Sequence, residues 1–336
     1  MRIISPSIEI MRTGLELPYQ YVTPEQFIEK VGRTCYKSED KITDDSAAKF
    51  VSTLIKRGHE AMIEHWSLIF KTNAVAYNEF KDDWFTLLSS SQIPVEDRLR
   101  PYLRFTDHIL PSGEMRFVIS GNMRALRDYV KACVAGFGMV PQYLWGMVRN
   151  YPLFFPEFQD YVPGIFVNDI LIPVKVNELS DEERRIHQDI TIKFICDRGV
   201  SHEIVRHRVA SFAQESTRYC NYGLDKFGQE ITVVRPSWCS EADDKYEDWR
   251  GGCYTAESSY FTMLADGATP QEARSVLPNS TKTEVIVTMN IDGWSHFFDL
   301  RCAPAAHPDM REVARMARAQ LEIDGVWKFT DDSSDN

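Results

Sequence analysis

The chain has 336 residues and a mass of 38.8 kDa, which is enough for one large domain or two ordinary ones. Its net charge of −11 and pI near 5.3 argue against a nucleic-acid-binding protein, so any phosphate site must be a local group of arginines. Seven scattered cysteines without a Cys-x-x-Cys pair indicate reduced thiols, and no long apolar run or signal segment is present, so we expect a soluble cytoplasmic protein without a membrane partner.

Two amphipathic helices are predicted first, over residues 23–36 and from about residue 45 to 57. The segment 58–65 follows and leads into a predicted strand at residues 66–70. This segment contains two histidines and two glutamates, which could suggest a metal. Its histidines are six residues apart, however, and a helical pair of metal ligands needs four. We therefore interpret it as a helix-to-strand corner with hydrogen-bonded polar residues and expect no metal.

Residues 71–188 are rich in aromatic residues and proline and are not of low complexity, so we expect them to fold. A helix is predicted across residues 122–132. The preceding Ser120-Gly121-Asn122-Met123-Arg124 allows two interpretations. It is either a glycine turn that delivers Asn122 and Arg124 to a ligand, or an ordinary helix N-cap.

The rest of the chain predicts alternating helices and strands. Ser201 is expected to cap a short helix that carries Glu203, and Gly251-Gly252 is expected to break a longer one. In the last helix, we expect Met316 to be buried together with Val313 and Leu321. The predicted elements are a capping box at 180–183, strands at 190–194, 231–234 and 283–291, and helices at 243–264, 269–277, 292–301 and 310–323.

The stretch from Arg206 to Tyr219 concentrates three arginines, a histidine and two serines with Gln214 and Glu215. Guanidinium groups bind phosphate, while hydroxyl groups and backbone N–H groups bind further oxygens. This composition indicates a site for an anionic, hydrogen-bonding ligand. The alternative is an exposed basic turn that pairs with neighbouring carboxylates. We expect the stretch to form a helix, a loop and a second helix just beyond a strand.

Three separated patterns in this sequence resemble the flavin-dependent thymidylate synthase family. They occur in the family's order and together cover roughly residues 25–70 and 190–320. The first pattern is Gly58-His59-Glu60 with Glu64-His65. The second is Arg206-His207-Arg208, followed after seven residues by Ser216 and then by Arg218-Tyr219. The third is Ala273-Arg274 with Leu277-Pro278, Asn290 and Leu300-Arg301.

The resemblance implies an α+β fold, with a twisted mixed or antiparallel sheet flanked by helices and a helix-rich insertion. Residues 1–70 and 189–325 would form the catalytic domain, residues 71–188 an inserted folded segment, and residues 326–336 a disordered tail. It also implies methylation of dUMP to dTMP. FAD would be the cofactor, methylene-tetrahydrofolate the carbon donor and NADPH the reductant, in a homotetramer.

The family's site residues can be assigned to matching positions of this chain. By resemblance, Arg301 stabilises the N3-deprotonated, electron-rich form of uracil and is the catalytic residue. Ser216 is expected to bind phosphate and not to act as a nucleophile, because no neighbouring base is evident. The implied substrate-binding residues are Glu203, Arg206, Gln214, Glu215, Ser216, Thr217, Arg218, Arg274 and Arg301. The implied FAD-binding residues are His59, Ala61, Arg206, His207, Arg208, Gln214, Asn290 and His296.

The sequence departs from the family's pattern at several positions. Glu203 stands where the family usually has Gln, and Ala213-Gln214 replaces the commoner Asn-Glu. Asp292 replaces an arginine that contacts FAD in many relatives, so Arg124 is a candidate for the missing cation. The alternative is a non-catalytic nucleotide-binding protein that has lost the flavin.

Because His296 and Arg301 are five residues apart on a helix, we expect them to contact different parts of the site.

Overall fold

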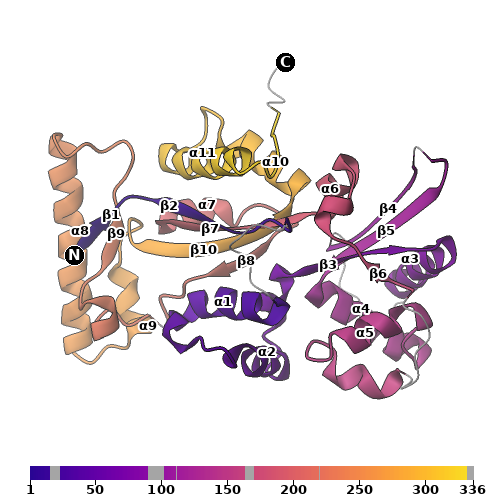
Figure 1. Ribbon diagram of the computed structural model, residues 1–336. Coiled ribbons are helices and arrows are strands. Elements are labelled where there is room, and N and C mark those ends of the chain that lie inside the picture. The colour runs from indigo at the N-terminus through magenta and orange to yellow at the C-terminus, as the bar shows by residue number, and fades with distance from the viewer. Residues whose placement is uncertain (16–22, 90–101, 111, 163–169, 219, 331–336) are drawn as a thin grey trace. The chain divides into compact units, whose positions relative to one another are not determined.

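The computed structural model describes residues 1–15, 23–89, 102–110, 112–162, 170–218 and 220–330 (Figure 1). The chain divides into two compact units, which are described separately. The first unit comprises Met1–Thr13, Lys30–Lys41 and Ile190–Asn336, and the second comprises Gly14–Glu29 and Ile42–Asp189. Both combine helices with mainly antiparallel strands, which confirms the predicted α+β class.

The first unit is built on a four-stranded sheet in the order β2-β7-β10-β8, in which β2 pairs antiparallel with β7 and β10 pairs antiparallel with β8. Strands β7 and β10 are buried along almost their whole length, as in strands covered on both faces. A separate parallel pair is formed by β1 and β9. The strands are β1 (Arg2–Ile4), β2 (Ser7–Arg12), β7 (Asp189–Asp197), β8 (Ser211–Gln214), β9 (Thr232–Val234) and β10 (Lys282–Asn290).

Helices α10 and α11 lie along one side of this sheet, and α8 lies beside β1 and β9 (Figure 1). Helix α10 packs through Trp294, whose indole Nε1 donates a 3.0 Å hydrogen bond to the carbonyl of Ile190. The helical segments of the unit are η1 (Glu39–Lys41), α7 (Arg198–Ile204), η7 (Asp225–Phe227), α8 (Asp244–Ala265), α9 (Pro270–Ala273), η8 (Arg274–Val276), α10 (Ile291–Arg301) and α11 (Pro308–Ile323).

The second unit contains an antiparallel sheet in the order β4-β5-β3-β6, with α3 and α4 on one side and α6 on the other (Figure 1). Its core is rich in aromatic rings, and Phe80 stacks on Tyr129 with ring centroids 4.4 Å apart. The elements are α2 (Ser46–Lys56), η2 (Glu60–His65), β3 (Ser67–Thr72), α3 (Ala74–Ser89), β4 (Leu103–Ile109), β5 (Met115–Asn122), α4 (Met123–Phe137), η4 (Gln142–Leu144), α5 (Trp145–Asn150), η5 (Pro156–Tyr161), β6 (Ile172–Pro173), η6 (Val176–Glu178) and α6 (Asp181–His187).

Helix starts that the sequence marks with caps are present. In α1 (Pro24–Tyr36), the hydroxyl oxygen of Thr23 accepts from the Gln26 N–H at 3.3 Å. The predicted capping box at Ser180 opens α6, with both reciprocal hydrogen bonds formed. The same arrangement at Thr269 opens α9. These local predictions are confirmed because each depends only on residues within one turn of each other.

Three local expectations are wrong. Helix α8 continues through Gly251-Gly252 without a break. Asp197, and not Ser201, caps α7 by accepting from the Val200 N–H at 2.6 Å, while the Ser201 hydroxyl donates within the helix. Met316 is 36% exposed, because the buried face of α11 is formed by neighbouring positions.

The two interpretations of the segment around Asn122 are resolved by its hydrogen bonds. The side-chain oxygen of Asn122 accepts from the Ala125 N–H at 2.8 Å, so this residue is an ordinary N-cap of α4. Gly121 is closely packed, since a Cβ at this position would approach Cδ2 of Leu103 to 2.5 Å and force that side chain to shift. The segment therefore joins β5 directly to α4.

The boundary between compact units does not coincide with the division expected at residue 70. Residues 42–70 group with the segment 71–188 expected as an insertion. In the segment expected as a tail, Val326 and Phe329 are buried, and residues 331–336 lie outside the described residues. Among the helices that are described, none combines the length and apolar character needed to cross a bilayer.

Candidate functional site

The Arg301 guanidinium is fixed by three hydrogen bonds in the first unit. Its Nε donates to Nε2 of His207 at 2.9 Å. Its two terminal nitrogens donate to the carboxylate of Glu203 at 2.8 Å and to the Glu203 carbonyl at 3.1 Å. Arg301 is the last residue of α10, while Glu203 lies in the last turn of α7 and His207 three residues beyond α7. Residues assigned to the site from two separate motifs therefore lie together.

His207 is a buried, neutral acceptor. Burial, followed by the positive charge of Arg301 and by His296, lowers the pKa of His207 to about 4. The ring is therefore uncharged at pH 7. Since Nε2 accepts the hydrogen bond from Arg301, the ring proton is on Nδ1.

His296 and Arg301 border the same ring, contrary to the expectation that they address different parts of the site. The His296 and His207 ring centroids are 6.1 Å apart, and Arg301 binds the same His207 ring directly. Phe297 also contacts it, with the centroids 4.7 Å apart. The spacing argument failed because His207 is large enough to meet side chains from two sides of α10.

Arg206 and Arg208 flank His207 and are both exposed. Within the described part of the chain, neither guanidinium forms an ion pair. The next residue, Val209, has φ 57°, a left-handed conformation that is costly for a β-branched side chain. The turn thus places two uncompensated cations at the surface beside a buried histidine, which is a suitable arrangement for binding an anion.

The second half of the Arg206–Tyr219 stretch is a strand followed by a loop, and not the expected second helix. Gln214 ends β8 and donates to the hydroxyls of Ser201 and Thr283, at 2.9 and 3.2 Å. The following residues 215–218 form what we call the phosphate loop, after its expected role. Tyr219 lies outside the described residues.

The phosphate loop lies against the residues that follow α9. One terminal nitrogen of Arg274 donates to the Thr217 hydroxyl at 3.4 Å, and the Arg218 Nε donates to the Gln271 side chain at 3.1 Å. Arg218 and Arg274 are both exposed. The structure therefore brings two arginines and the Ser216 hydroxyl, all expected phosphate ligands, to one loop.

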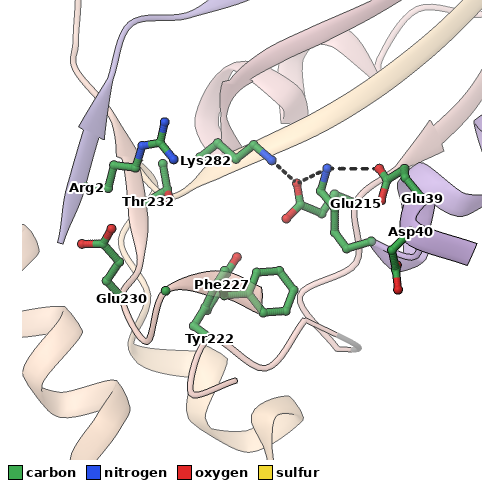
Figure 2. A pocket seen from close by; sticks show the side chains of 11 residues that line it. Arg2, Glu39, Asp40, Glu215, Tyr222, Phe227, Glu230, Thr232 and Lys282 are labelled. Carbon is green, nitrogen blue, oxygen red and sulfur yellow. Dashed lines mark hydrogen bonds and ion pairs between the residues drawn. The ribbon is translucent and has the colours of Figure 1, made fainter. Parts of the chain in front are cut away.

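The Glu215 side chain, in contrast, is only 3% exposed. It lies on the wall of a cavity of about 540 Å³ and pairs there with Lys282, whose Nζ is 2.7 Å from the carboxylate (Figure 2). Lys37 and the aromatic rings of Tyr222 and Phe227 line the same cavity. The sequence reasoning missed Lys37 and Lys282. In the sequence, the one feature that pointed to Lys282 was its position directly before the predicted strand 283–291.

Asn290 caps α10, since its side-chain oxygen accepts from the Gly293 N–H at 2.9 Å. Of the residues expected to bind FAD, His59 and Ala61 belong to the second unit and are exposed there. Arg124, the candidate substitute cation, also belongs to the second unit. Its guanidinium pairs with Glu64 at 2.7 Å, so its charge is already compensated.

Residues 185–323 match the protein family described as "Thymidylate synthase complementing protein". This segment contains Arg301, Glu203, His207 and the whole phosphate loop. It does not include His59 or Lys37.

Curated relatives named flavin-dependent thymidylate synthase match about a third of the chain. The protein from Pyrococcus furiosus is 39% identical over 119 residues, which are 35% of this chain and 48% of that protein. The protein from Geobacter sulfurreducens is 35% identical over 117 residues, covering 35% of this chain and 49% of that protein. The chain thus spans about half the length of the curated relatives that it matches.

Among solved structures, the UMP/dUMP methylase PolB from Streptomyces cacaoi, bound with 5-Br UMP, is 22% identical to this chain. The similarity has a TM-score of 0.35 and covers 40% of this chain and 70% of that one. The TM-score is too low to establish a common fold. The family match and the curated relatives therefore support the resemblance of this chain, through residues 185–323, to the flavin-dependent thymidylate synthases.

Proposed function

We propose that this protein is an FAD-dependent thymidylate synthase that methylates dUMP to dTMP. Methylene-tetrahydrofolate would be the carbon donor and NADPH the reductant. The similarity of residues 185–323 to this family supports the reaction class. The geometry around Arg301 is the observation that carries the proposal.

Arg301 is held in one orientation and still has hydrogen-bond donors to offer. A guanidinium has five N–H groups, and the three bonds to His207 and Glu203 use three of them. No other partner of this side chain exists among the described residues, so two N–H groups remain. A cation fixed in this way loses little conformational entropy when it binds a planar, oxygen-bearing ring.

The remaining donors suit the chemistry of uracil. C5 of uracil is a poor nucleophile, and methylation there requires electron density from the ring. A guanidinium beside N3 and a ring carbonyl stabilises the N3-deprotonated, electron-rich form. Because the cation is oriented before the reaction, it stabilises the developing negative charge without reorganisation. Arg301 is therefore the residue that we assign to catalysis.

The phosphate of dUMP would be bound at the phosphate loop. Arg218 and Arg274 are exposed there, and the Ser216 hydroxyl lies on the same loop. The backbone N–H groups of Glu215 and Ser216 are engaged within the protein, by the carbonyls of Glu284 and Cys35. Side chains would therefore provide most of the phosphate contacts. Glu203, Arg206, Gln214 and Thr217 complete the proposed substrate set.

The residues present fit FAD, whose pyrophosphate needs cations. Arg206 and Arg208 meet that need, since both are exposed and have no carboxylate partner in the described parts of the chain. His59, Ala61, His207, Gln214, Asn290 and His296 are the further residues that we propose for FAD. The chemistry that FAD would supply when bound is transfer of hydride from the reductant and of the methylene carbon to C5. We also propose a homotetramer in the cytoplasm.

The test is the visible absorption spectrum of the purified protein, recorded with and without added FAD. We expect a yellow protein whose flavin absorbance is bleached by NADPH in the presence of dUMP. A colourless protein that binds dUMP but takes up no FAD would instead support the non-catalytic nucleotide-binding alternative. A protein that binds neither would contradict both.

A further inference from the structure

Glu215 is a buried carboxylate next to the proposed phosphate ligands. It directly precedes Ser216 and is 3% exposed. A buried carboxylate needs a nearby positive charge to offset the cost of removing it from water. A carboxylate beside a phosphate site also repels the phosphate unless its charge is neutralised. The structure supplies this compensation through two lysines. Lys282 Nζ is 2.7 Å from the carboxylate (Figure 2). Lys37 Nζ is 4.0 Å from it.

A second glutamate completes the group. Glu284 pairs with both Lys37 and Lys282. Burial raises the pKa of Glu284, but the positive charges of Lys282 and Lys37 outweigh this effect and lower it to about 2. We call Lys37, Glu215, Lys282 and Glu284 the lysine–glutamate cluster. Its two cations and two anions make it neutral as a whole.

The backbone ties the phosphate loop to the same elements. The Glu215 N–H donates to the Glu284 carbonyl at 2.8 Å, and the Ser216 N–H donates to the Cys35 carbonyl at 3.0 Å. Glu284 lies on β10, and Cys35 is two residues before Lys37. The loop is thus held by β10 and by the C-terminal end of α1 with the adjoining Lys37, each through a backbone bond and a lysine.

Side-chain alternation explains why the cluster can act without touching the ligand. The Gln214 side chain donates to the hydroxyls of Ser201 and Thr283, whereas the Glu215 carboxylate pairs with Lys282. The two consecutive side chains therefore point to opposite faces of the sheet. Lys282 and Lys37 therefore act on the loop through Glu215 and the backbone.

We propose that Lys282 and Lys37 are positioning residues for nucleotide binding. They hold the Glu215 carboxylate away from the ligand side of the phosphate loop and neutralise its charge, so that Ser216 and Arg218 can bind a phosphate dianion. This inference rests on the proposed function, because it takes dUMP as the ligand.

The experiment is calorimetric titration of dUMP into the purified, FAD-supplemented protein. Lys282→Met removes one of the two positive charges beside the Glu215 carboxylate, and we expect it to raise the Kd for dUMP by about tenfold. Lys282→Met combined with Glu215→Gln removes both charges, so we expect a Kd within about threefold of wild type. Lys282→Arg keeps the charge and should also bind within about threefold. Lys245→Met, on the exposed surface of α8, is the matched control and should leave the Kd unchanged.

Thermal unfolding of each variant separates positioning from a general loss of structure. Rescue of the Kd by the double variant supports the inference. A double variant that binds as weakly as Lys282→Met, or a Lys282→Met protein that binds like wild type, overturns it while leaving the proposed function intact. A wild-type protein that does not bind dUMP contradicts the proposed function and this inference together.

Discussion

Nε of Arg301 donates a hydrogen bond to Nε2 of His207 across 2.9 Å, between residues 94 positions apart in the sequence. The bond requires a neutral His207 ring, and the pKa of about 4 ensures this at physiological pH. The histidine of the Arg-His-Arg motif therefore orients the arginine at the end of α10. Two motifs that the sequence shows separately form one arrangement in the structure.

The carboxylate of Glu203 should restrain the activity of Arg301. Glu203→Gln keeps a side-chain oxygen that can accept from Arg301 but removes the opposing negative charge. We expect kcat to rise about fivefold, on the order of 1 kcal/mol, because Arg301 then stabilises negative charge on uracil more strongly. The measurement is kcat for tritium release from C5-labelled dUMP.

Glu203→Leu is the control, since it removes both the charge and the acceptor. Arg301 then keeps only the bonds to His207 and to the backbone carbonyl, and we expect kcat to fall. A Glu203→Gln enzyme no faster than Glu203→Leu would show that the charge does not oppose catalysis.

Local features of this fold could be predicted because neighbouring residues determine them. The caps at Thr23, Ser180 and Thr269 are examples, since each hydrogen bond closes within three residues. The α7 cap was mispredicted because Asp197 and Ser201 are both good cap residues. Strand β8 was missed because it has only four residues and gains its stability from pairing with β10.

The lysine–glutamate cluster could not be predicted for a different reason. Lys37 and Glu284 are 247 residues apart, and no local pattern connects them. The family resemblance also gave no indication of Lys37 or Lys282. By contrast, His207 and Arg301 were both assigned to the site from motifs, although only the structure shows the hydrogen bond between them.

His187 should make stability depend on pH. Its two ring nitrogens contact the hydroxyls of Ser120 and Thr106 at 2.7 and 2.8 Å, and burial, then the charge of Arg104, lowers the pKa of His187 to about 3. The folded state therefore favours the neutral ring. Its contribution to stability is complete above pH 6.5, the ordinary value, and is lost as the pH falls from 6.5 towards 3.

At pH 5 this loss should reach about 2 kcal/mol. The measurement is the free energy of unfolding in urea at pH 7.5 and pH 5.0, for wild type and His187→Gln. The decrease between the two pH values should be about 2 kcal/mol smaller in the variant. His207, whose pKa is also lowered, is present in both proteins and its effect cancels. Equal decreases would mean that His187 does not titrate as described.

Arg218 and Ser216 should affect binding more than turnover. Phosphate contacts exist in the ground state and in the transition state, so Arg218→Ala should raise the Kd for dUMP by about 10- to 100-fold with little change in kcat. Ser216→Ala should retain measurable turnover, because we propose that the hydroxyl is a phosphate ligand and not a nucleophile. Arg250→Ala, on exposed α8, is the control and should change neither constant. A Ser216→Ala enzyme that binds dUMP normally but releases no tritium would identify a nucleophile.

Tritium release from C5-labelled dUMP by Arg301→Lys is the most direct test of the proposed mechanism. Lysine keeps the positive charge but cannot hold the planar arrangement that His207 and Glu203 impose on Arg301. We expect turnover with methylene-tetrahydrofolate and NADPH to fall on the order of 10²-fold, or roughly 3 kcal/mol, while the dUMP Kd changes much less. An Arg301→Lys enzyme that releases tritium at the wild-type rate would contradict the assignment of catalysis to Arg301.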